Sequence, residues 1–259
     1  MNGSLLVELE EQDKVWSVSF DPNGHYIATG SDDGTARLWD LQGNLLREFK
    51  GHTRWVDSLS FSPDGKRLAT ASGNGIAYLW DLQGNLLREF KGHQTQVWAL
   101  SFSPNGQYLA TASGDGTARL WDMHGNLLVV FQGSQSRVMK SRYLEDYQSS
   151  SSILDISFSP DGQRIATAFN GNGTTRLWDL QGNLLAEFHE WMEDPVQSIS
   201  FSPDGRHLAT ALETRNEKTI VRLWRVETLD ELLARGCDWL KYYLASHPEA
   251  REKLKVCQK

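Results

Sequence analysis

One fifteen-residue string, LWDLQGNLLREFKGH, occurs twice in this chain without a change, at residues 38–52 and 79–93. The two copies begin 41 residues apart, looser copies follow at 120–131 and 177–188, and a fifth is cut short after Trp224. Self-similarity at a period of about 20–50 residues is typical of solenoids, propellers and other repeat arrays. The repeat therefore constrains the architecture most, and function is sought where the copies differ.

The third copy shows how one repeat folds. Residues 97–102 alternate apolar and polar side chains over most of their length, as a half-buried strand does, and the tight turn SPNG follows at 103–106. Further strands are expected at 108–112, 117–122 and 126–131, separated by Gly-bearing turns. One such meander cannot bury both faces, whereas copies stacked radially can. The sequence predicts an all-β propeller of four-stranded antiparallel blades.

The ends of the repeat array favour five blades. Residues 4–9 (SLLVEL) match the outer strand NLLREF, and the last repeat stops after its third strand, near Val226. One outer strand, four whole repeats and three inner strands add up to five blades. We expect the N-terminal strand to close the last blade, which would cover exposed sheet edges. A monomer is favoured; the alternatives are two chains that share a larger ring and a piece of a longer protein.

The chain divides into a propeller over residues 1–226 and a C-terminal extension over residues 227–259. In the extension, Thr228 with Glu231 forms a capping box. Apolar residues then fall near one helical face, namely Leu229, Leu232, Leu233, Leu240, Tyr243 and Leu244. A short α-helical extension is predicted, which either docks on the flank of the propeller or binds another domain or subunit.

The repeat resembles the WD-repeat β-propeller family. The residues that carry the likeness are five Pro-Asn/Asp-Gly turns, the GlyHis pairs at 51–52 and 92–93, and TrpAsp at 39–40, 80–81, 121–122 and 178–179. The resemblance implies a buried network of a His before the first strand, a Ser or Thr on the second, an Asp in the following turn and the Trp of the third. Only blade three carries the full set: His93, Ser113, Asp115 and Trp121.

The other blades depart from this pattern. Blade two has His52, Ser72 and Trp80 with Asn74 in place of the acid, and blade one has Ser31, Asp33 and Trp39 with Glu11 in place of His. Blade four has Ser134 and Asn172 with Phe169 near the second-strand position, and blade five keeps Trp224 but has Leu212 and Lys218 at the polar positions. A Ser–His–Asp set also suggests a hydrolase, but a packing network beside a buried Trp is favoured because such networks satisfy buried polar groups.

Candidate partner-binding residues lie where the copies differ. The resemblance places the residue after the first Val of each blade at the mouth of the ring: Trp16, Asp57 and Trp98, with Leu154 and Gln197 in the last two blades. Trp55 lies two residues before Asp57. Trp is enriched at binding hot spots, although each indole would also serve as extra core against a neighbouring blade. An insertion at 139–152, with Arg142, Tyr143 and Tyr147, is a second candidate or a loop that merely tolerates change.

Composition excludes several function classes. The formal net charge of −7 argues against nucleic-acid and anionic-membrane binding. No apolar run approaches the ~20 residues that span a bilayer, and the start resembles no signal peptide. Cys237 and Cys257 are too few for a disulfide framework. A reduced, cytoplasmic protein is expected, with no cofactor and no metal, because neither a phosphate-binding loop nor a metal-ligand spacing is present.

These observations predict a non-catalytic scaffold that presents a rigid propeller face to a protein or peptide partner. The first alternative is a regulatory or sensor module of a larger NTPase-containing assembly, because the tail resembles the C-terminal extensions of cyanobacterial WD-repeat proteins. Some of those carry a nucleotide-hydrolysing NACHT-type domain upstream. The least favoured alternative is an enzyme that uses the central channel, since the inner-strand positions hold mostly Ser, Ala and small apolar residues.

Overall fold

The structure is a computed structural model that describes residues 4–10, 13–132, 152–170, 173–189, 195–213 and 219–227. These residues form five antiparallel sheets, each built from strands consecutive in the chain. The first three sheets contain β1 (Val15–Phe20), β2 (Tyr26–Ser31), β3 (Ala36–Asp40) and β4 (Leu45–Phe49); β5 (Val56–Phe61), β6 (Arg67–Ser72), β7 (Ile76–Asp81) and β8 (Leu86–Lys91); and β9 (Val97–Phe102), β10 (Tyr108–Ser113), β11 (Thr117–Asp122) and β12 (Leu127–Gln132). The last two contain β13 (Ile153–Phe158), β14 (Arg164–Phe169), β15 (Thr174–Asp179) and β16 (Leu184–His189); and β17 (Val196–Phe201), β18 (His207–Glu213) and β19 (Thr219–Arg225). The all-β architecture of four-stranded blades is confirmed.

The turns that join the strands are built by the repeated polar residues. In blade three the Ser103 hydroxyl accepts the Tyr108 amide at 2.9 Å, and Gly106 adopts a φ of 67°, which L side chains rarely take. At the turn between β11 and β12, the Asp122 carboxylate accepts the Asn126 amide at 2.8 Å and the Asn126 side-chain amide at 2.8 Å. The Asp of each TrpAsp pair is therefore a turn residue, which explains why it recurs with the Gly and Asn that follow it.

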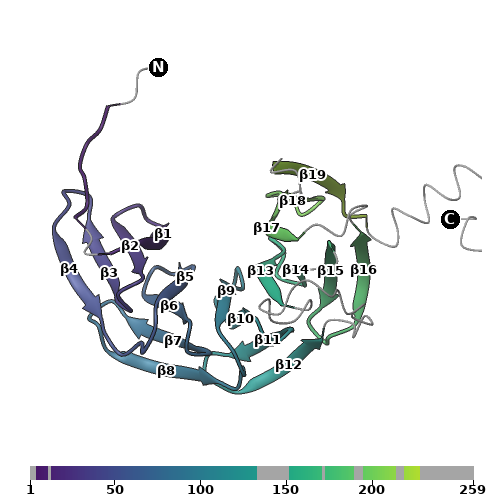
Figure 1. The fold of residues 1–259 in the computed structure, drawn as a ribbon, viewed down its shortest axis with the longest axis horizontal. Coiled ribbons are helices and arrows are strands. Elements are labelled where there is room, and N and C mark those ends of the chain that lie inside the picture. The colour runs from purple at the N-terminus through teal and green to yellow at the C-terminus, as the bar shows by residue number, and fades with distance from the viewer. Residues whose placement is uncertain are drawn as a thin grey trace, which may run out of the picture.

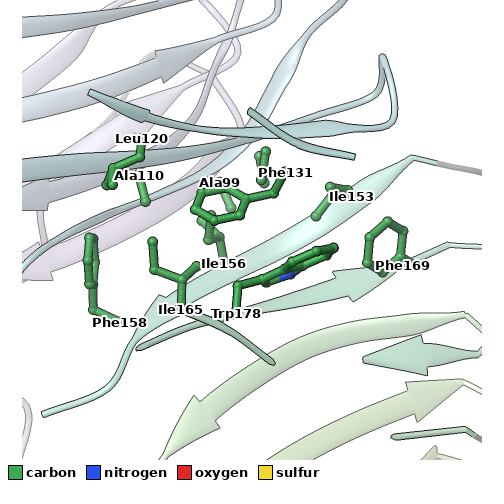
Figure 2. Close-up of a cluster of buried hydrophobic side chains, with 12 residues drawn as sticks. Ala99, Ala110, Leu120, Phe131, Ile153, Ile156, Phe158, Ile165, Phe169 and Trp178 are labelled. Atoms are coloured by element: carbon green, nitrogen blue, oxygen red, sulfur yellow. The ribbon is translucent and has the colours of Figure 1, made fainter. Parts of the chain in front are cut away.

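The core lies between neighbouring blades. Figure 2 shows the cluster between blades three and four, where Phe131 of β12 faces Trp178 of β15 with ring centroids 5.6 Å apart. The same contact joins Phe49 to Trp80, Phe90 to Trp121 and Phe188 to Trp224. Each outer strand thus packs its Phe on the Trp of the next blade. The two residues that recur in the sequence string form the joint between repeats.

The predicted ring closure is not found among the residues that the structure describes. Residues 4–10 form no strand, and the last sheet has three strands, β17, β18 and β19. Figure 1 shows the five sheets as an open arc, with β1, β5, β9, β13 and β17 along its inner side and β4, β8, β12 and β16 along its outer side. The four joints repeat one set of contacts and so bend the arc by similar amounts. At this curvature the last blade does not reach the first.

Several sequence predictions fall outside the described residues. They are the helical extension at 228–259 with Cys237 and Cys257, the insertion residues Arg142, Tyr143 and Tyr147, and the network positions Glu11, Ser134, Asn172 and Lys218. They stay predictions, as does the domain boundary at residue 226.

Candidate functional site

A β-bulge opens the first strand of every blade at the same place. In blade one, Val15 pairs with Ser31 and Ser17 with Gly30, so Trp16 is the extra residue. The register skips in the same way at Asp57, Trp98, Leu154 and Gln197. A bulge re-aims a side chain that would otherwise alternate with its neighbours. These five bulges lie on one rim of the array, together with the turns between the second and third strands. We call this surface the bulge rim.

Trp16 is the most exposed bulge-rim aromatic, with 48% of its surface accessible. Its Nε1 donates to the Asp32 carboxylate at 3.0 Å, and the Lys14 ammonium lies 3.6 Å from its ring centroid. Asp32 belongs to the turn between β2 and β3. The indole is therefore held in a fixed orientation on the surface by an acid and a cation from its own blade.

Trp55 and Trp98 are half-buried, each on a glycine of its own blade. A Cβ at Gly73 would lie 2.7 Å from Trp55 Cε2, and the Gly73 amide donates to the Trp55 carbonyl at 3.1 Å. A Cβ at Gly114 would lie 3.3 Å from Trp98 Nε1, and this Nε1 is buried without a hydrogen-bond partner. These two indoles cover turns of their own blades, and their role in binding a partner stays a prediction.

Asp57 places a carboxyl at the bulge position of blade two, and its Oδ2 is buried with no hydrogen-bond partner among the described residues. Burial raises the pKa of Asp57 to about 7; the side chain of Trp55 opposes this rise and the charge of Asp32 adds to it. Asp57, Asp32, Trp16 and Trp55 therefore influence one another across blades one and two. The sequence analysis did not select Asp32 as a site residue. Asp32 stands where blades two and three have a glycine in this turn, and that difference between the repeats could have pointed to it.

The buried polar network is centred on a threonine of each second strand. In blade three the Trp121 indole donates to Thr111 Oγ1 at 2.9 Å, His93 Nε2 lies 2.8 Å from the same oxygen, and His93 Nδ1 lies 3.0 Å from Asp115. Trp80, Trp178, Trp39 and Trp224 donate to Thr70, Thr167, Thr29 and Thr210 at 2.9–3.0 Å.

The sequence placed Ser113, Ser72 and Ser31 at this position, and this is corrected. Ser113 instead donates to the Gln96 carbonyl at 2.8 Å and receives the Asp115 amide at 3.2 Å. Residues two apart in a strand share a face, so Thr111 and Ser113 both point into the network. Thr111 lies opposite Arg119, nearer to Trp121 in the register. The serine therefore holds the turn and the threonine holds the indole.

Burial and the hydrogen-bond partners together favour neutral histidines in this network. His52 Nδ1 lies 3.1 Å from the Gly34 carbonyl, which only accepts, so Nδ1 carries the proton and Nε2 accepts from the Thr70 hydroxyl. Burial lowers the pKa of His52 to about 4. Burial also lowers the pKa of His93, although Asp115 opposes this. Burial alone would raise the pKa of Asp115, but bonds from His93, Thr117 and the Gln94 amide hold it well below its usual range.

Thr111 Oγ1 lies within hydrogen-bond distance of His93 Nε2, but Thr111 is fully buried and also accepts the Trp121 indole, so a substrate does not reach this hydroxyl. His93 joins Thr111 and Asp115, while Ser113 bonds to backbone carbonyls and not to the imidazole. Blade one keeps the bond from Trp39 to Thr29 and pairs Arg37 with Asp33 at 2.6 Å. Blade two joins Asn74 to the Tyr78 hydroxyl at 2.8 Å. The described part of the chain contains no cluster of three or more His, Cys, Asp or Glu arranged to hold a metal ion. Within the described ranges, no helix has the length and hydropathy needed to cross a membrane.

Comparison with known families agrees with this geometry. The family "WD domain, G-beta repeat" matches residues 3–40, 43–81, 84–122, 141–179 and 182–225. The chain belongs to this WD-repeat family. Its members generally act as protein-interaction scaffolds, which is the coarse function that the match supports.

Individual relatives match over 29–50 residues, a length close to that of one repeat. The nuclear distribution protein nudF of Aspergillus flavus is 52% identical over 46 residues, 17% of this chain and 10% of that protein. The WD repeat-containing protein slr1409 of Synechocystis is 38% identical over 50 residues, 19% of this chain and 15% of that protein. The ribosome biogenesis protein ERB1 of Scheffersomyces stipitis is 52% identical over 29 residues, 11% of this chain and 4% of that protein. The chain thus spans a small part of these relatives.

Proposed function

We propose that this protein is a non-catalytic scaffold whose bulge rim binds a protein or peptide partner. One observation carries the proposal: every blade places its bulged residue on the same rim, and the chain uses that position for Trp16, Asp57 and Trp98. A position that a fold displays five times, with a different side chain almost every time, is suited to recognition. A cytoplasmic location stays a prediction.

Blades one and two supply the part of the rim with the strongest recognition chemistry. Trp16 offers a rigid apolar surface already fixed by Asp32 and Lys14, so binding costs it little side-chain entropy. Asp57 adds a half-buried carboxyl to the same rim, where it lies close enough to Asp32 to feel its charge. The scaffold needs no ordering step, because the strands that hold these residues are already paired.

The test compares a bulge-rim variant with a variant on the opposite rim. The full chain carrying Trp16→Ala and Asp57→Ala is used to capture partners from source cells, beside wild type and Leu41→Ala. Leu41 is equally exposed but lies in the turn between β3 and β4, at the other end of the antiparallel sheet. We expect partners held by wild type and Leu41→Ala to drop at least tenfold with the double variant, at unchanged thermal stability.

Two results would contradict the proposal. Equal capture by all three proteins would place recognition away from the bulge rim. A hydrolytic activity in wild type that His93→Ala abolishes, while capture is unaffected, would favour an enzyme built on the buried network.

A further inference from the structure

The outer strand of blade three differs from its copies in charge. β8 reads LLREFK, and the same six residues stand at 45–50 in blade one, whereas β12 reads LLVVFQ and has no charged side chain. Leu127, Leu128 and Val130 of β12 are 44%, 47% and 38% exposed. Blade three therefore presents an apolar outer strand where blades one and two present Arg, Glu and Lys.

β12 is also the edge of its sheet. The strand order is β12-β11-β10-β9, so among the described strands β12 pairs with β11 alone. Figure 1 shows β12 on the outer, convex side of the arc, away from the inner strands. An edge strand presents backbone N–H and C=O groups that a further strand can bind, and proteins commonly protect such edges with charged side chains. β4 and β8 have this protection, and β12 lacks it.

The part of β12 beyond its bulge is regular enough to pair again. Every outer strand has a bulge near its start, and in β12 this bulge lies between Leu127 and Val129. Val129, Val130, Phe131 and Gln132 then pair with β11 without interruption. An edge of this length gives a short ladder, so a strand bound there is held by few hydrogen bonds and by the apolar side chains beside them.

Charge decides whether an outer strand can pair with itself. Residues directly opposite in an antiparallel pair lie on the same side of the sheet. A two-fold axis between two copies therefore passes at one residue, which lies opposite its own copy. With the axis at Val130, Val130 lies opposite Val130 and Val129 lies opposite Phe131. The ladder is then apolar throughout.

The same axis in the other blades is unfavourable. Val130 pairs with Arg119, and the residues at the equivalent pairing position are Glu48, Glu89 and Glu187. Each of these carboxylates would lie opposite its own copy, and like charges directly opposite are destabilising. Self-pairing is therefore specific to blade three.

The cation next to this edge is held within its own blade. In blades one and four the equivalent arginine lies 3.5 and 2.7 Å from the glutamate of the outer strand. Arg119 instead donates to Thr117 Oγ1 at 3.4 Å and lies 3.9 Å from Asp115, with 14% of its side chain exposed. A strand that approaches β12 thus has no ion pair on β12 to desolvate.

We propose that β12 is a homodimer interface. The β12 strands of two copies pair antiparallel about a two-fold axis at Val130 and join two four-stranded sheets into one. A second copy is the occupant because the strand fits itself in this register without a charge on either side. The dimer differs from two chains that share a larger ring, and it leaves the bulge rim open. Its small area makes it a weak dimer that depends on concentration.

The first test measures association of the full chain. Sedimentation equilibrium from micromolar to millimolar concentration should show a reversible equilibrium between monomer and dimer. Amide exchange in β12 should slow at least tenfold as the dimer forms, while exchange in β4 and β8 stays unchanged.

Variants taken from the sister repeats identify the edge. Val129→Arg with Val130→Glu gives β12 the ArgGlu pair of β8, which the fold already accepts, and should raise the dissociation constant of the dimer at least tenfold. Val130→Glu alone should act in the same direction, at unchanged thermal stability. Leu185→Glu is the matched control: Leu185 is 51% exposed on the outer strand β16, and this variant should dimerise as wild type does.

The converse substitution should create a second interface. Arg88→Val with Glu89→Val removes the central charges of β8, so a chain with two uncharged edges should form species larger than a dimer.

Four outcomes overturn the proposal. A chain that stays monomeric at every concentration, with fast exchange in β12, has no such interface. A monomer whose β12 amides exchange slowly at every concentration has this edge covered by its own chain. A dimer that persists in the Val129→Arg, Val130→Glu variant uses another surface. An unchanged dimer after Arg88→Val with Glu89→Val shows that charge does not control these edges.

Discussion

The threonine at the centre of each buried network gives the sharpest test of what holds a blade together. Thr111 is fully buried and lies 2.9 Å from Trp121 Nε1 and 2.8 Å from His93 Nε2. Thr111→Val keeps the shape and removes the hydroxyl, so both ring nitrogens lose a partner inside the protein. A buried polar group left unsatisfied costs about 1–3 kcal/mol, so we expect Thr111→Val to lower the free energy of unfolding by about 2–4 kcal/mol.

Blade four offers the matched control. Thr167 is equally buried and receives the Trp178 indole at 2.9 Å, but in the part of the chain that the structure describes it has no bond to a histidine. Thr167→Val should therefore cost about 1–2 kcal/mol, since one nitrogen is left unsatisfied in place of two. The pair isolates the contribution of His93, because the two substitutions change the same atoms in equivalent strands.

The assay is urea unfolding followed by tryptophan fluorescence and by far-ultraviolet circular dichroism, with both variants and wild type at pH 7.5. Coincident transitions license a comparison of midpoints at a common slope. If Thr111→Val costs no more than Thr167→Val, the histidine bond contributes nothing net. If both variants unfold with wild type, the threonines are not the centre of the network.

Two further predictions concern pH and the bulge rim. Burial lowers the pKa of His52 to about 4 from 6.5, so between these pH values the unfolded chain binds a proton that the folded chain does not bind. The free energy of unfolding should therefore be highest above pH 6.5 and fall by up to about 3 kcal/mol as the pH drops to 4. It should fall less steeply in His52→Gln, as measured by urea midpoints across that range. Gly73→Ala would place its Cβ 2.7 Å from the Trp55 ring, so it should lower the free energy of unfolding by about 1–2 kcal/mol and raise acrylamide quenching of Trp55. The same substitution in a Trp55→Ala background should leave the free energy of unfolding unchanged, and an equal loss there would disprove the clash.

The sequence was sufficient to predict strands and blades because each repeat carries its own local signals. Residues 97–102 and 117–122 were predicted as strands and are β9 and β11. The expected strand at 108–112 ends one residue before β10 does, and the expected strand at 126–131 begins and ends one residue before β12. Turn chemistry at Ser103 and Gly106 marks these boundaries directly. Such signals need only neighbours in the chain, so they can be read without a structure.

The candidate site was less accessible because it depends on register across strands. The bulges that place Trp16 and Asp57 on the rim are irregularities in the pairing of the first and second strands. No residue type in the sequence indicates where such a bulge lies. The choice between Thr111 and Ser113 has the same origin. Both residues fit the family pattern, and only the pairing of Thr111 with Arg119 brings it beneath Trp121.

Ring closure failed for a different reason, which follows from the repeats themselves. Strand phase says only that the ends of an array are compatible, and any array that begins with an outer strand and ends with three inner strands satisfies it. Closure also requires that the bend at each joint, summed over all blades, completes a circle. The bend is set by contacts such as Phe90 on Trp121, which near-identical repeats reproduce at every joint. A chain of fixed joints cannot adjust its curvature to its length, and so the first and last sheets of the described residues do not meet.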